Sequence, residues 1–175
     1  FMVIHYSREN SKIEFTEASF RLANGAFILG LKGRCNISVN LTQYNITRNT
    51  LLTIVPHHIV QAHFMSDDFE GYVVLFTPSF AEDINLLRSN LPFMTEMRYN
   101  PLVSLTEEEC NLFTNFCRFF HDIEGNELIG NSPEVRKGLL TSLLYTLGAL
   151  YRRQLPQVIN EKPSRANIIF KKFLS

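Results

Sequence analysis

The chain has 175 residues, of which 45% are hydrophobic and 19% charged. This composition excludes intrinsic disorder and suffices for the core of one domain, or of one domain with a helical appendix. Lysine and arginine together number 17, as do aspartate and glutamate, so no overall positive charge indicates that the chain binds nucleic acid by itself. The longest apolar-leaning run, Leu139 to Tyr151, is shorter than the ~20 residues of a membrane span. No signal peptide is visible in the sequence, and we expect a cytoplasmic protein.

Residues 20–76 predict short β-strands at a spacing typical of a small barrel or sandwich. The run from Cys35 to Leu41 alternates apolar and polar side chains, as in a strand with one buried face. Residues 27–31 lead into it through Gly33, which predicts a tight hairpin. The apolar residues of the alternating run, which would form pocket wall or core, are Cys35, Ile37, Val39 and Leu41. Further short runs lie at Tyr44–Ile46, Leu51–Val55, Ile59–Met65 and Tyr72–Phe76.

After residue 77 the apolar period becomes helical. A cap and a proline at 77–78 predict the start of one helix. Its apolar stripe would be Phe80, Ile84 and Leu87. Thr106 and Glu109 have the spacing of a capping box and predict a second helix, which Gly125 ends.

A third helix is predicted over 133–155, and Pro156 would end it. Residues 157–163 have the composition of a linker. Residues 164–175 then begin another amphipathic helix with a local excess of basic side chains, as expected on the approach to a nucleic-acid-binding unit. We therefore expect the chain to be a piece of a longer protein.

The cysteines and histidines do not predict a metal site. Three cysteines are too few and too widely spaced for a disulfide framework, and we expect buried free thiols at Cys35, Cys110 and Cys117. On one regular strand, His57 and His58 would leave opposite faces, and His63 would lie about 20 Å from His57, although a bulge could change this parity. No aspartate or glutamate occurs between Ala18 and Ser66. We expect no catalytic residue, no metal ion and no cofactor.

The order of these elements resembles a cupin barrel, and in particular the N-terminal sensor domain of bacterial AraC-type transcriptional regulators. The segments that carry the resemblance are residues 27–37, residues 44–46, and residues 51–58 with Pro56 and His58 at their end. The resemblance implies an α+β fold, with a cupin-like antiparallel β-barrel (a double-stranded β-helix or jelly roll) followed by a helical subdomain. The implied division is 1–77 for the barrel sensor, 78–156 for the helical dimerisation subdomain, and 157–175 for the linker and the start of a helix-turn-helix domain.

This family implies the effector-sensing and dimerisation domain of a transcription regulator, not an enzyme. DNA would be bound only through a helix-turn-helix domain beyond residue 175. The alternative is a metal-dependent cupin enzyme, such as an isomerase or dioxygenase, and a stand-alone interaction domain is a third possibility. Metal-dependent cupins carry His-x-His and a nearby glutamate, whereas here His57 and His58 are adjacent and no carboxylate follows until Asp67. This departure favours a sensor.

The resemblance also implies where an effector would bind. A small molecule, whose identity the sequence does not give, would enter the barrel and be covered by the N-terminal arm, Phe1–Arg8. The polar residues expected to contact it are Arg21, His58, His63 and Tyr72.

The helix predicted over 133–155 indicates a homodimer, because its leucines follow a 3-4-3 spacing typical of coiled-coil contacts. The contact residues would be Leu140, Leu143, Leu147, Leu150 and Tyr151. A strip of small residues would let a second helix approach closely, at Gly138, Ser142 and Ala149. The spacing leaves open the alternative that the leucines form the core of a single chain.

Overall fold

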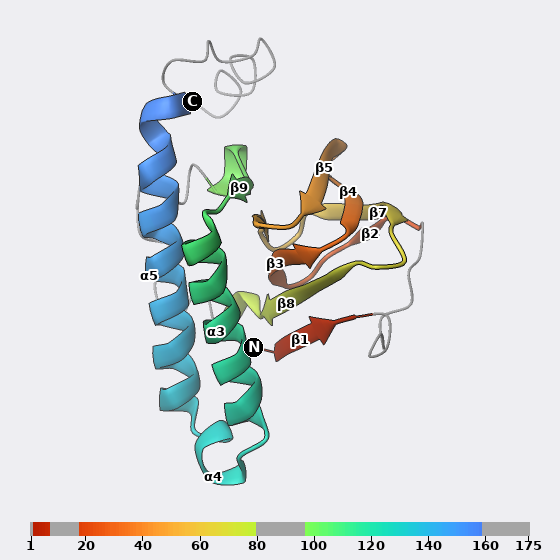
Figure 1. Cartoon of the computed structure of the whole chain (residues 1–175). Helices are drawn as coiled ribbons and strands as arrows, with labels where there is room; N and C mark the ends of the chain where they lie inside the picture. The colour runs from red at the N-terminus through yellow and green to blue at the C-terminus, as the bar shows by residue number, and fades with distance from the viewer. Residues whose placement is uncertain (1, 8–17, 80–96, 159–175) are drawn as a thin grey trace.

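The structure, a computed structural model, describes residues 2–7, 18–79 and 97–158. Within these residues, the strands form two antiparallel sheets, which we call together the sheet pair (Figure 1). In spatial order, the five-stranded sheet contains β1 (Met2–Tyr6), β8 (Glu70–Phe76), β3 (Gly25–Lys32), β6 (Thr50–Ile54) and β9 (Leu102–Ser104). The four-stranded sheet contains β2 (Phe20–Arg21), β7 (Ile59–Met65), β4 (Arg34–Val39) and β5 (Thr42–Thr47). The helices are α3 (Glu107–Glu124), α4 (Glu127–Gly130) and α5 (Pro133–Val158).

The five-stranded sheet is buried on both faces. Figure 1 shows α3 and α5 side by side, both on one side of the sheets. Alternate residues of β8 divide between the two faces: Tyr72 and Val74 belong to the core shared with the helices, whereas Val73 and Leu75 face the four-stranded sheet. The described residues therefore form two hydrophobic cores, one between helices and sheet and one between the two sheets.

The capping signals predicted the two long helices well. Thr106 caps α3 in extended conformation and forms the complete capping box with Glu109, and Gly125 caps the other end of the helix. The predicted helix over 133–155 corresponds to α5, which begins at Pro133 as expected. It continues to Val158, so the prediction that Pro156 ends the helix was wrong.

Two details of the predicted strands are corrected. Residues 27–31 and 35–39 do not form a hairpin, because β3 and β4 belong to different sheets. Gly33, with a φ of 67°, turns the chain from one sheet to the other, and a Cβ there would lie 2.7 Å from the Phe69 backbone nitrogen. Leu41 does not share the buried face, because it lies in a turn with a φ of 70° and its side chain is 94% exposed.

The sequence did not predict three strands. The N-terminal arm, expected to cover the barrel, is strand β1, which pairs with β8 from Met2–Leu75 to Tyr6–Gly71. The short strand β2 pairs with β7 in the four-stranded sheet. Strand β9 follows residue 78 in the chain yet pairs with β6, so the five-stranded sheet includes a segment from the region expected to be helical. The apolar stripe predicted after residue 79 and the segment 159–175 lie outside the described residues.

A buried hydrogen-bond cluster attaches α5 to the sheet. The Tyr151 hydroxyl lies 2.9 Å from Thr53 Oγ1 and donates to the Pro101 carbonyl oxygen at 3.0 Å. Tyr151 is 2% exposed, and burial raises the pKa of its hydroxyl above the ordinary value. The hydroxyl therefore stays protonated and available as a donor at neutral pH.

We predict that Tyr151→Phe lowers the free energy of unfolding by about 1–3 kcal/mol, because it leaves buried polar groups of Thr53 and Pro101 without this partner. Urea denaturation followed by circular dichroism measures the change. Tyr145→Phe, on an exposed part of the same helix, is the matched control and should change stability by less than about 0.5 kcal/mol. Equal effects of the two substitutions would contradict the role assigned to the cluster.

Candidate ligand-binding cavity

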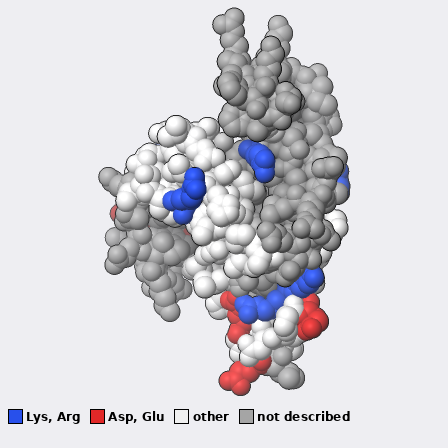
Figure 2. Space-filling model, turned by 180° about the vertical axis from the view of Figure 1, so that it is seen from behind, with Lys and Arg blue, Asp and Glu red and all other residues white. Residues whose placement is uncertain are grey.

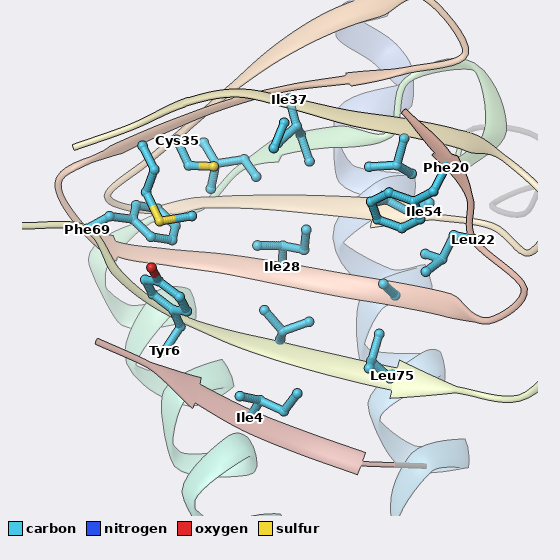
Figure 3. A pocket seen from close by; sticks show the side chains of 16 residues that line it. Ile4, Tyr6, Phe20, Leu22, Ile28, Cys35, Ile37, Ile54, Phe69 and Leu75 are labelled. Carbon is cyan, nitrogen blue, oxygen red and sulfur yellow. The ribbon is translucent and has the colours of Figure 1, made fainter. Parts of the chain in front are cut away.

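A cavity of about 280 Å³ lies between the two sheets (Figure 3). Its wall comes from strands of both sheets and from the segments beside β2 and β8. The lining residues are Ile4, Tyr6, Phe20, Leu22, Ala26, Ile28, Cys35, Ile37, Ile46, Ile54, Val60, Ala62, Met65, Phe69, Val73 and Leu75. Protein interiors are packed almost without voids larger than a water molecule, and a space of this size is large enough to hold a small molecule.

The alternation of side chains along each strand and the register between strands direct these side chains into the cavity. Ile4, Val73 and Ile28 are cross-strand partners on β1, β8 and β3, so they form one row across the five-stranded sheet. Ile28 and Val73 are only partly buried although their strands are interior to the sheet. Their remaining exposure is explained by the cavity, which they face.

Different groups lie at the two ends of the cavity. Figure 3 shows Phe20 near Ile54 at one end, and Tyr6, Phe69 and Cys35 together at the other. Phe20 is 46% exposed, whereas Cys35 at the other end is 4% exposed. At the other end, the rings of Tyr6 and Phe69 are in contact, with their centroids 5.9 Å apart.

The described lining residues are neutral and almost entirely apolar. The hydrogen-bonding groups on their side chains are the Tyr6 hydroxyl, the Cys35 thiol and, as a weak acceptor, the Met65 thioether. Burial raises the pKa of Cys35 to about 11, so the thiol is uncharged at neutral pH. The described part of the wall can hold an apolar molecule by excluding water, and it carries no carboxylate, imidazole or charged group to activate a substrate.

The residues predicted to contact an effector do not converge on this cavity, and none of the four is among its lining residues. Arg21 is exposed on β2, and Tyr72 is buried in the core that faces the helices. His63 lies 2.5 Å from the Ser38 hydroxyl, in a hydrogen bond between neighbouring strands. His58 is partly buried beyond the end of β6, where burial first and the charge of Arg98 second lower its pKa.

Sequence reasoning missed Tyr6 and Phe20 as lining residues. The segment from Val3 to Tyr6 was expected to be a covering arm, although Ile4 and Tyr6 are spaced two apart, as on one face of a strand. Phe20 belongs to a strand of two residues, which is too short to produce a detectable alternation.

The histidines lie differently from the strand that the sequence suggested. Strand β6 ends at Ile54 and β7 begins at Ile59, so His57 and His58 lie in the connection, where His57 has a φ of 69°. The argument that His57 and His58 leave opposite faces of one regular strand therefore does not apply. Within residues 2–7, 18–79 and 97–158, no three His, Cys, Asp or Glu side chains are grouped as metal ligands. No helix in the same ranges is long and apolar enough to span a membrane.

The leucines predicted to form a dimer contact are occupied within the chain itself. Leu140, Leu143, Leu147 and Tyr151 are buried in the core between the helices and the five-stranded sheet, and Leu150 packs against that core. The prediction that these residues contact a partner chain is therefore corrected. The 3-4-3 spacing reflects packing against the chain's own helix and sheet, which the sequence alone could not distinguish from packing against a partner.

Comparisons with known proteins show similarity in structure and none in sequence. No protein-family model matches the sequence, and no curated protein matches it. An apo ToxT variant from Vibrio cholerae strain SCE256 is 11% identical, with a TM-score of 0.51, over 86% of this chain and 56% of the ToxT chain. The AraC-like transcriptional activator CuxR is 10% identical, with a TM-score of 0.48, over 86% of this chain and 48% of CuxR.

Cupin proteins are also among the similar structures. The cupin domain of Cnp3 from Schizosaccharomyces pombe is 14% identical, with a TM-score of 0.33, over 43% of this chain and 56% of that domain. The chain thus spans about half the length of the regulators it matches. The likeness to ToxT, over most of the chain, confirms the expected resemblance at the level of fold alone: an α+β fold with two antiparallel sheets and helices on one side.

Proposed function

We propose that this chain is the effector-sensing and dimerisation domain of an AraC-type transcription regulator, with a small-molecule effector bound between the two sheets. The cavity of about 280 Å³ is the observation that carries the proposal. Unfilled apolar space costs stability, on the order of 20 cal/mol per Å³ in engineered cavities. A chain that leaves such a space next to well-packed cores gains most if a ligand fills it and stabilises the liganded state.

The composition of the wall favours binding over catalysis. A metal-dependent cupin enzyme needs several imidazole or carboxylate ligands that converge on one point. Among the described residues, the wall of this cavity supplies isoleucine, valine, leucine and aromatic side chains in their place. Regulation of transcription would then require a DNA-binding domain outside this chain, to which the effector signal is passed. A cytoplasmic location is part of the same proposal.

We predict that the chain binds 1-aminonaphthalene, a dye that is neutral at pH 7.5 and whose fluorescence responds to apolar surroundings, and that Ala62→Leu weakens this binding at least about tenfold. Ala62 faces the cavity, and a larger side chain would occupy space that the dye needs. Fluorescence titration measures the affinity. Ala23→Leu, at an exposed position outside the cavity, is the matched control. No dye binding, or equal effects of both substitutions, would contradict the proposal.

Dimerisation is proposed through a different surface from the buried leucines. On α3, the side chains of Leu112 and Phe119 are 49% and 52% exposed. Together with the partly buried Phe116 and Ile123 they follow a 4-3-4 spacing, and we call these four residues the ridge. On α5, the smaller side chains of Ser142, Thr146 and Ala149 follow the matching 4-3 spacing, and we call these three residues the strip.

Two ion pairs join α3 and α5, and the proposal takes the ridge and the strip to lie on the face of the helix pair between these ion pairs. Glu109, one helical turn before the ridge, pairs with Arg153 of α5 at 2.9 Å. Near the opposite end of α3, Glu124 pairs with Arg136 of α5 at 3.5 Å. A large ridge next to a small-residue strip is self-complementary, because a two-fold axis sets the ridge of each chain against the strip of its partner. Two linked sensors would bring two DNA-binding domains to paired half-sites.

We predict that the wild-type chain is a dimer at tens of micromolar and that Phe119→Asp makes it a folded monomer, because a charge would be buried in the contact. Light scattering coupled to size exclusion measures the mass, and circular dichroism checks the fold. Leu41→Asp, which changes the most exposed leucine on the sheet pair, is the control and should leave the dimer intact. A monomeric wild-type chain would contradict the proposal that the ridge and the strip form a dimer contact.

A further inference from the structure

We infer that the effector is a neutral, largely apolar molecule of about a dozen non-hydrogen atoms, with one hydrogen-bonding group that meets the Tyr6 hydroxyl. This inference rests on the proposed function and adds the chemical class of the ligand. Its size follows from the cavity: an apolar cavity of ~150 Å³ holds benzene, so one of about 280 Å³ holds roughly twice as many atoms.

The charge of the ligand follows from the wall. None of the described residues that line the cavity is charged, and an ion taken from water into such surroundings loses its hydration without compensation. The basic residues of the strands point elsewhere, because Arg21, Lys32 and Arg34 are exposed. Arg34 instead lies over the ring of Phe64, with its guanidinium carbon 5.1 Å from the ring centroid. Figure 2 likewise shows few charged side chains on the visible surface of the sheet pair, whereas acidic and basic groups gather near α4.

Tyr6 supplies the one directional contact. Its ring is held by β1 and by contact with Phe69, and Figure 3 shows its oxygen on the side of Cys35. None of the residues that the structure describes forms a hydrogen bond with this hydroxyl. The neighbouring thiol is a weak hydrogen-bonding group. A hydroxyl or carbonyl group on the ligand would therefore find its partner in Tyr6.

The two ends of the cavity give the ligand an orientation. Tyr6 is partly buried at one end of the cavity, and Phe20 is 46% exposed at the other. The polar group of the ligand would therefore lie at the Tyr6 end, and its apolar body would extend past Ile28 and Ile37 toward Phe20. A carboxylate that stayed beside the exposed Phe20 would lose the contact with Tyr6.

The test compares three molecules that share one ring system: naphthalene, 2-naphthol and 2-naphthoate. At pH 7.5 the first two are neutral and the third is ionised. Isothermal titration calorimetry measures their affinities for the wild-type chain and for Tyr6→Phe. We expect 2-naphthol to bind most tightly and 2-naphthoate at least about tenfold more weakly. Tyr6→Phe should weaken 2-naphthol about three- to tenfold and leave naphthalene unchanged, because naphthalene makes no hydrogen bond.

The outcomes separate this inference from the proposed function. If 2-naphthoate binds as tightly as 2-naphthol, or if Tyr6→Phe leaves the affinity for 2-naphthol unchanged, the ligand class is wrong while the cavity remains a binding site. If none of the three molecules binds and the dye does not bind either, the proposed function fails together with the inference. Naphthalene is the internal control for folding, since its unchanged affinity shows that Tyr6→Phe leaves the cavity intact.

Discussion

The five-stranded sheet determines most of what this protein can do, because its strands send alternate side chains to two different cores. One set packs against α3 and α5, and the other faces the four-stranded sheet. In the first core, Phe120, Leu140 and Leu147 are fully buried. The second core contains the cavity. The sheet therefore contributes to the helix-facing core on one side and to the wall of the cavity on the other.

This arrangement offers a physical route from ligand to partner. The same strands carry cavity-lining residues and residues of the helix-facing core, as Val73 and Val74 do on β8. A ligand that shifts the strands would thus act on the surface against which the helices pack, and a ridge on α3 that binds a second chain would respond to that shift. Tyr151 makes the connection stiffer, because its hydroxyl attaches α5 to Thr53 on β6. Coupling between ligand binding and the α3 surface needs two conformations of the protein whose relative populations the ligand changes.

Much of the fold could be predicted from residue patterns, whereas the site could not. The capping box at Thr106 and the alternation from Cys35 to Val39 are local signals, and the structure has the helix and the strand they indicate. Whether the leucines of α5 face the same chain or a partner depends on tertiary packing that spacing does not encode. The cavity depends on register across β1, β8 and β3, which no single segment determines. His63 and Tyr72 were predicted as ligand contacts because they are polar, whereas the described wall of the cavity consists mainly of apolar side chains.

The isoleucine methyl groups allow the most direct test of the central claim that the space between the sheets is a ligand site. In a methyl nuclear magnetic resonance titration with 2-naphthol, Ile28, Ile37 and Ile54 report on the wall of the cavity, and Ile59 and Ile129 report on exposed positions outside it. The account predicts saturable shifts at the wall isoleucines and unchanged signals at the two exposed ones. Shifts confined to the exposed isoleucines, or no saturable shift at any of the five, would contradict it.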